Sequence, residues 1–164
     1  PMHTAAAFAD TLFRFGRCAH TAAELVSGEK DEAEKIRRLS SIQNALQRFF
    51  WFTIEFGLMR GDKPGEHKAY GSGLMSSYGE IVHCIESPTV QRHPIQMEWV
   101  VNQHFEIDHY QPLLFVVNDF DHLYELLGQL EQWMKDGKLD NVTPGWRDMS
   151  DADVKSFLEA SLNK

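Results

Sequence analysis

Apolar residues recur at intervals of three and four along much of the chain, which is the spacing that places them on one face of a helix. This spacing predicts one helix from about Thr4 to Val26, a second from about Asp31 to Gly57, and another that follows Asn118. The expected core positions on these helices are Phe8, Leu12, Phe15, Ala19, Ala22, Val26, Ile36, Leu39, Ile42, Leu46, Phe49, Phe50, Thr53, Ile54, Phe120, Leu123, Leu127, Leu130 and Met134.

The segments between these helices carry signals of turns and strands. Ser77 and Glu80 have the spacing of a capping box, so a further helix should start there. The glycines between Gly71 and Ser77 predict a turn just before that helix. Residues 105–117 are rich in apolar and β-branched side chains and predict extended chain that Pro112 interrupts.

A last helix is predicted after Ser150, with Val154, Phe157 and Leu158 on one face. Together these elements predict a predominantly helical α+β fold with a few short strands. No repeat and no low-complexity linker divides the chain, so we expect residues 1–164 to form a single domain.

Composition matters mainly through what it excludes. The chain is 43% hydrophobic and 12% aromatic, which is enough to bury a core. Its net charge of -8 offers no basic surface for nucleic acid, and no apolar run reaches the length that crosses a membrane. The two cysteines, Cys18 and Cys84, indicate no disulfide framework, and there is no signal peptide, so we expect a cytoplasmic protein.

One acid stands inside the most apolar stretch of the chain. Residues 49–59 read FFWFTIEFGLM, and Glu55 is their only charged member. A carboxylate among aromatic side chains is unfavourable unless a cation or hydrogen-bond donors meet it. We therefore expect Glu55 to point into an interior site with a cationic partner, for which a metal ion is the best candidate. The pattern leaves open that Glu55 instead pairs with Arg48 or Arg60, or reaches solvent where the helix ends.

Three blocks of sequence resemble a known enzyme family. They are FWFTIEFGLMRG, KAYGSGLMSSYGE and HYQPLLFVVNDF, and they resemble the pterin-dependent aromatic amino acid hydroxylases in residues and in spacing. The resemblance runs from Pro1 to about Met134, and the segment beyond it is unlike the eukaryotic tetramerisation tail. It therefore implies a bacterial phenylalanine-4-hydroxylase type, of which this chain resembles the C-terminal part of the catalytic domain.

The resemblance implies a non-haem Fe(II) that is held by two histidines and one carboxylate, together with a tetrahydropterin (tetrahydrobiopterin) cofactor. Glu55 matches the carboxylate ligand. The family takes both histidines from an HExxxH segment, which this sequence does not contain. Pro1 to Thr4 resemble the residues that follow that segment, so we expect the chain to begin directly after it. Phe50 stands where the family commonly has a tyrosine beside the iron and cofactor.

The resemblance also implies a pocket for an aromatic amino acid. Trp51 and Phe56 match its aromatic walls, and the turn that receives the backbone groups of the substrate is matched by Gly73, Ser76 and Ser77. Tyrosine-using relatives carry an acid where Ile107 stands, and tryptophan-using relatives resemble a Phe where Trp51 stands. The implied reaction is hydroxylation of L-phenylalanine to L-tyrosine with O2.

Two other functions remain as alternatives. Because the two ligand histidines of the HExxxH segment are absent, the chain could be a non-catalytic remnant that serves as a binding or assembly module. Loss of an N-terminal part would expose apolar surface near Trp51 and Phe52 and favour self-association. A small zinc or redox protein built on Cys18, Cys84 and the histidines is disfavoured, because these residues lack the spacing of metal ligands.

Overall fold

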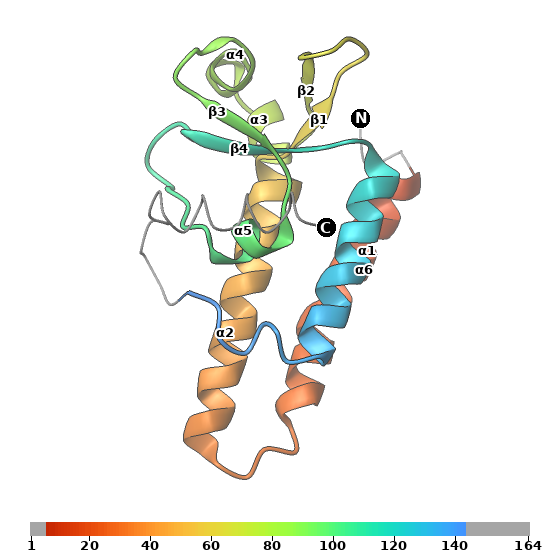
Figure 1. The fold of residues 1–164 in the computed structure, drawn as a ribbon, viewed down its shortest axis with the longest axis vertical. Coiled ribbons are helices and arrows are strands. Elements are labelled where there is room, and N and C mark those ends of the chain that lie inside the picture. The colour runs from red at the N-terminus through yellow and green to blue at the C-terminus, as the bar shows by residue number, and fades with distance from the viewer. Residues whose placement is uncertain (1–5, 144–164) are drawn as a thin grey trace, which may run out of the picture.

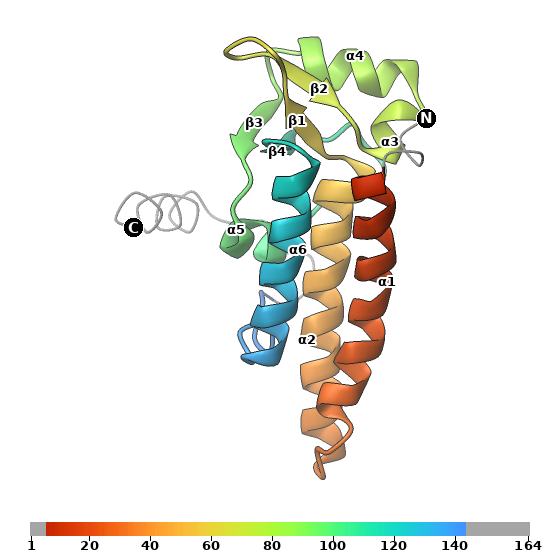
Figure 2. The ribbon, with the colours of Figure 1, turned by 90° about the vertical axis from the view of Figure 1, so that its right-hand side faces the viewer.

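Three long helices form the body of the computed structural model, which describes residues 6–143. They are α1 (Ala6–Val26), α2 (Glu32–Phe50) and α6 (Phe120–Lys135), and they lie side by side (Figure 2). Asp31 caps α2 by accepting hydrogen bonds from two backbone N–H groups of the first turn. The predicted positions of all three helices are confirmed, with α2 ending earlier than expected.

A small mixed sheet lies across one end of these helices (Figure 1). Its strand order is β2-β1-β4-β3, in which β1 pairs antiparallel with β2 and parallel with β4, and β4 pairs parallel with β3. The strands are β1 (Leu58–Arg60), β2 (His67–Ala69), β3 (Gln91–Pro94) and β4 (Leu113–Val117). The remaining helices are α3 (Ser72–Met75), α4 (Tyr78–Glu86) and α5 (Met97–Asn102).

The sheet separates two apolar clusters, because successive side chains of a strand point to opposite faces. On β4, Phe115 and Val117 belong to the main core with the long helices. Leu114 belongs to a smaller cluster with Leu74 of α3 and Cys84 of α4. The helices α3 and α4 therefore cover part of the second face, and this part lies next to the end of α2.

Two predicted core faces are wrong in detail. On α1, Cys18 is buried and Ala19 is exposed, so the buried stripe passes one residue earlier than the apolar spacing predicts. On α2, Ile36 is 57% exposed and precedes Ser41, the first buried residue of this helix, so the buried face begins later than predicted. The predicted face of α6 is confirmed, with Leu123, Leu127 and Leu130 fully buried.

Several expected connections also differ from prediction. The segment between Gly71 and Ser77, predicted as a turn, contains the short helix α3. In residues 105–117 only the part after Pro112 is a strand, and the part before it is an irregular loop. Ser77 caps α4 as predicted. The helix predicted after Ser150 lies outside the described residues.

Buried polar groups attach neighbouring segments to α2. The hydroxyl of Ser41 donates to the carbonyl of Leu139 at 2.7 Å and accepts from the backbone N–H of Val142 at 2.9 Å. Arg48, only 4% exposed, donates to the carbonyl of Val101 at 2.9 Å and so holds the end of α5. Within residues 6–143, every helix is too short or too polar to cross a bilayer.

Candidate functional site

The chain leaves the α-helical path at the point where the candidate site begins. Trp51–Glu55 form a π-helical turn, η2, in which the N–H of Phe56 donates to the carbonyl of Trp51 at 2.8 Å. The hydroxyl of Thr53 bonds back to the carbonyl of Phe49. The prediction of one α-helix to Gly57 is therefore wrong beyond Phe50. A single π turn widens the helix and shifts the direction of the following side chains, a feature frequent at functional sites.

Glu55 lies half-buried at the end of this turn. Its Oε2 accepts a hydrogen bond from the hydroxyl of Ser72 in α3 at 3.0 Å, which orients the carboxylate. The ion pairs of the described residues do not include Glu55, and Arg48 is directed to Val101 instead. The alternatives of pairing with Arg48 or Arg60 are therefore wrong within residues 6–143. The carboxylate is held by a neutral donor, which leaves its charge available for a cation.

Aromatic rings surround the π turn on the side of Trp51. The ring of Trp51 stacks on Phe105 with centroids 4.3 Å apart and lies 4.5 Å from the ring of Phe56. Its Nε1 donates to Oε1 of Gln111 at 3.1 Å. Gln111 is 2% exposed and donates in turn to the carbonyl of Glu106, so the indole is held by a fixed partner. This arrangement provides a rigid aromatic wall next to Glu55.

The expected exposure of apolar surface is wrong for one of its two residues. Trp51 is half-buried, but Phe52 is only 2% exposed. Phe52 is covered by the chain itself, with edge-to-face contacts to Phe105 and Phe115 at centroid distances of 6.3 Å and 5.2 Å. Self-association through this surface stays a prediction.

Two glycines allow α3 to approach the π turn. A Cβ built on Gly73 would lie 2.9 Å from Cζ of Phe56 and 3.0 Å from the carbonyl oxygen of Glu55. A Cβ on Gly71 would overlap the same carbonyl group. Because neither glycine has a side chain, the backbone of α3 comes close enough for the hydroxyl of Ser72 to reach Glu55.

Replacing Gly73 with alanine is expected to destabilise the protein by about 1–3 kcal/mol, because the new methyl group has no room beside Glu55 and Phe56. The matched control is Gly16→Ala in α1, where no atom lies within 4 Å of the added Cβ. That control should be stabilising by about 0.5–1 kcal/mol, because alanine favours helix. Urea denaturation measures both changes, and equal effects of the two substitutions would contradict the close approach.

The other predicted site residues occupy different surroundings. Ser77 Oγ accepts from the N–H of Glu80 at 3.4 Å as a helix cap, and the exposed Ser76 donates to the carbonyl of Gly73 at 2.8 Å. Phe50 packs on Phe15 of α1 at a centroid distance of 5.3 Å. Ile107 is 68% exposed in the loop before β4.

The structure thus gathers Glu55, Trp51, Phe56 and Gly73 around the π turn. Phe50 directly precedes the π turn, but its ring packs toward α1, and Ile107 is exposed in the loop before β4.

The metal-ligand set is incomplete within the described residues. In that part of the chain, the group of three or more potential ligands that lie close together is Glu106, Asp108 and His109, and it does not include Glu55. Around Glu55 the described residues therefore offer one carboxylate ligand for a metal, whereas the family resemblance implies two histidine ligands in addition. Cys18 and Cys84 lie in α1 and α4, and burial raises the pKa of each thiol to about 11.

Three residues of this site were not predicted from the sequence. Ser72 and Gln111 each lie inside a block that carries the resemblance, but serine and glutamine are common surface residues and the spacing gives neither a role. Phe105 lies ahead of the third block and shows only as one aromatic residue among many. Contacts between segments distant in sequence define all three.

Comparison with known proteins identifies a family that this sequence matches. The family described as "Biopterin-dependent aromatic amino acid hydroxylase" matches residues 31–141. Phenylalanine-4-hydroxylase of Vibrio cholerae is 37% identical over 99 residues, which are 57% of this chain and 34% of that protein. Human tyrosine 3-monooxygenase is 40% identical over 88 residues, 53% of this chain and 15% of that protein.

The fold has a matching solved structure. A crystal structure of a phenylalanine hydroxylase mutant from Chromobacterium violaceum aligns with a TM-score of 0.64 and 24% identity, covering 88% of this chain and 46% of that chain. The two folds are therefore alike over most of this chain. This chain spans less than half the length of each of the three proteins.

Proposed function

Because this chain belongs to the biopterin-dependent aromatic amino acid hydroxylases, we propose that it forms the carboxylate-bearing part of a catalytic domain that converts L-phenylalanine to L-tyrosine with O2. The observation that supports this role most directly is Glu55, half-buried beside an aromatic wall and oriented by the hydroxyl of Ser72. In such a domain Fe(II) and tetrahydropterin supply the activation of oxygen, and this chain supplies one of three iron ligands.

The residues of this chain would position the substrate and exclude water. Trp51 and Phe56, both half-buried, offer ring surface against which an aromatic side chain can pack, and the buried Phe105 stacks on Trp51 and supports it. The hydrogen bond from Trp51 to Gln111 keeps the indole from rotating, so the wall is formed before the substrate arrives. Ser76 and Ser77 lie at the turn between α3 and α4 and would receive the backbone groups of the amino acid.

Phenylalanine is the proposed substrate because of two side chains. The size of Trp51 leaves less room for an indole. Ile107, which is exposed in the loop before β4, stands where tyrosine-using relatives carry an acid, so this position offers no carboxylate to a phenolic hydroxyl. Pocket differences of this kind shift preference by about 1–3 kcal/mol, so activity on the other aromatic amino acids is expected to be weaker and not absent. The family includes both phenylalanine and tyrosine hydroxylases among the proteins similar to this chain.

The proposal is tested with a hybrid protein, in which a family segment that carries HExxxH is joined ahead of this chain. The hybrid protein should form tyrosine from phenylalanine only when Fe(II) and a reduced pterin are both present. Competition assays with tyrosine and tryptophan measure the substrate preference. A folded hybrid protein that binds iron but hydroxylates none of the three amino acids would contradict the proposal.

A non-catalytic binding module is the second candidate, favoured by the incomplete ligand set around Glu55. Iron titration of residues 1–164 separates the two candidates. Stoichiometric Fe(II) binding by this chain without added histidines would contradict the binding-module candidate. Absence of binding here, with tyrosine formation by the hybrid protein, would support the proposed hydroxylase role.

Substitution of Ser72 tests how the carboxylate is oriented. We expect Ser72→Ala in the hybrid protein to weaken Fe(II) affinity about 10–100-fold, the usual cost of losing an outer-shell hydrogen bond to a metal ligand. Ser76→Ala is the matched control, because its hydroxyl bonds to Gly73 and not to Glu55. Metal affinity is measured with Co(II) by absorption spectroscopy. Equal affinities of the two variants would show that Ser72 does not position Glu55.

A further inference from the structure

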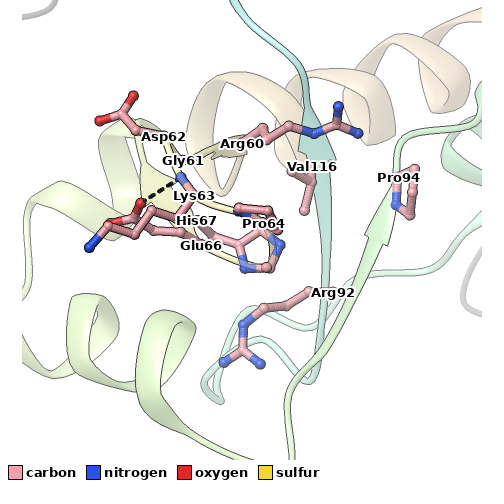
Figure 3. A pocket seen from close by; sticks show the side chains of 11 residues that line it. Arg60, Gly61, Asp62, Lys63, Pro64, Glu66, His67, Arg92, Pro94 and Val116 are labelled. Carbon is pink, nitrogen blue, oxygen red and sulfur yellow. Dashed lines mark hydrogen bonds between the residues drawn. The ribbon is translucent and has the colours of Figure 1, made fainter.

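A separate cavity lies on the sheet face that α4 leaves open. It has a volume of about 520 Å³, is open on one side, and is lined by the β1–β2 hairpin together with β3 and β4 (Figure 3). Leu58 of β1 and Leu114 of β4 belong to the small apolar cluster with α3 and α4. The residues two positions further along these strands, Arg60 and Val116, point to the same face of the sheet and line the cavity. No residue of the Glu55 site lines it, so the inference drawn from it is independent of the proposed function.

The hairpin loop that forms one wall is closed by backbone hydrogen bonds. The N–H of Gly61 donates to the carbonyl of Glu66 at 2.7 Å, and the N–H of Glu66 donates to the carbonyl of Lys63 at 3.0 Å. Gly65 has φ of 78°, which favours glycine at this position. One wall of the cavity is therefore a hydrogen-bonded turn of the backbone.

The charges in this cavity are predominantly positive, although the whole chain carries a net charge of -8. The lining contains three cationic side chains, those of Arg60, Lys63 and Arg92, and two carboxylates, those of Asp62 and Glu66. One of these, Asp62, is neutralised by Lys68 at 2.8 Å, and Lys68 lies outside the lining. Among the described residues, the head groups of Arg60 and Lys63 have neither a hydrogen-bond nor an ion-pair partner.

Arg92 contributes a charge that is fixed but not neutralised. Its guanidinium donates to three backbone carbonyls, those of Cys84, Ser87 and Val90, at 2.7, 2.9 and 3.1 Å. Burial, and then the charge of Arg92, lowers the pKa of His67, which lines the same cavity. Figure 3 shows Pro64 and His67 on the hairpin side, with Arg60 and Arg92 on opposite sides of the space beside Val116.

We propose that this cavity binds a small organic anion, whose phosphate or carboxylate group is held by Arg60 and Lys63 and whose apolar body packs on Pro64 and Val116. The head groups of Arg60 and Lys63 lie on different sides of the cavity (Figure 3), and each long side chain can turn toward an anion and provide a charge-assisted hydrogen bond. Proline and valine walls on the other sides favour an apolar body over a bare inorganic ion. The volume lies within the usual range of small-molecule sites.

The test titrates the full chain with phenyl phosphate, benzoate, inorganic phosphate and the neutral benzyl alcohol, observed by NMR at the ring of His67. The His67 signal is assigned with His67→Gln. We expect phenyl phosphate or benzoate to shift this signal saturably and to raise the pKa of His67, because a nearby anion favours the imidazolium. The stronger of these two ligands identifies the anionic group, and inorganic phosphate should bind more weakly than phenyl phosphate.

Charge variants give the decisive comparison. The double variant Arg60→Gln, Lys63→Gln should bind the preferred anion at least about tenfold more weakly, because two charge-assisted bonds are lost. Lys30→Gln, at the α1–α2 turn far from the hairpin (Figure 2), removes a charge and should keep the original affinity. Far-UV circular dichroism checks that each variant is folded. Absence of a saturable shift, equal affinity of the double variant and Lys30→Gln, or equally tight benzyl alcohol binding would overturn the proposal.

Discussion

Replacing Glu55 with glutamine is expected to lower the rate of tyrosine formation by the hybrid protein at least about 100-fold, since loss of a direct ligand should cost no less than loss of an outer-shell contact. Glutamine has nearly the same size and can still accept the hydrogen bond from Ser72. It lacks the negative charge that a carboxylate contributes to a facial iron site. The steady-state rate of tyrosine formation and the iron content of the protein should both decrease, and both are measured.

The fold should survive this substitution. Glu55 is half-buried and makes one side-chain hydrogen bond within residues 6–143, so Glu55→Gln should change the free energy of unfolding by no more than about 1 kcal/mol. Glu86→Gln, an exposed acid at the end of α4, is the matched control and should keep full activity. Full activity in Glu55→Gln would refute the ligand assignment.

Replacing Phe52 with alanine is expected to cost about 3–5 kcal/mol of folding free energy, because it leaves a cavity at a fully enclosed position. Phe52 is 2% exposed, and its ring meets Phe115 of β4 and Phe105 edge-to-face. The loss is a large share of the stability of an ordinary domain. Urea denaturation measures it as a lower transition midpoint with an unchanged m-value.

The matched control for this substitution removes the same side chain from the surface. Phe13 on α1 is 74% exposed, so Phe13→Ala should change stability by no more than about 0.5 kcal/mol. Phe52→Ala should also loosen the packing of Trp51 in the candidate site, because Phe105 packs on both Phe52 and Trp51. Similar free-energy changes for the two phenylalanines would contradict the placement of Phe52 in the core.

The main helices could be predicted because their signals are local. The spacing of apolar residues repeats over many turns in α1, α2 and α6, and capping residues mark where some of them begin. Asp31, Ser77 and Asp119 each bond to N–H groups of the following turn, so these starts are determined within a few residues of chain. At the end of α1, the N–H and the hydroxyl of Ser27 both donate to the carbonyl of Glu24, which is again a local contact.

The short strands and α5 could not be predicted in the same way. β1 and β2 have three residues each, too few for alternation to appear. They exist because β1 pairs with β4, more than fifty residues away along the chain. The buried side of α1 likewise depends on its neighbours, which is why Cys18 and not Ala19 faces the core.

In the candidate site, too, some features could be predicted from the sequence and others could not. A lone acid in an aromatic stretch identified Glu55, and the resemblance of the surrounding blocks identified the family that the comparisons support. The π turn, the hydroxyl of Ser72 and the packing of Phe105 on Trp51 became visible only in three dimensions.

The amino-acid sequence by itself determined where the long helices run, which residues begin them, and that one carboxylate must find a partner among aromatic rings. Each of these depends on residues within a few turns of one another. The tertiary structure decided which faces are buried, how the sheet pairs, and which donor meets Glu55. These outcomes depend on close approach between distant segments, which glycines such as Gly71 and Gly73 permit and which local propensity does not encode.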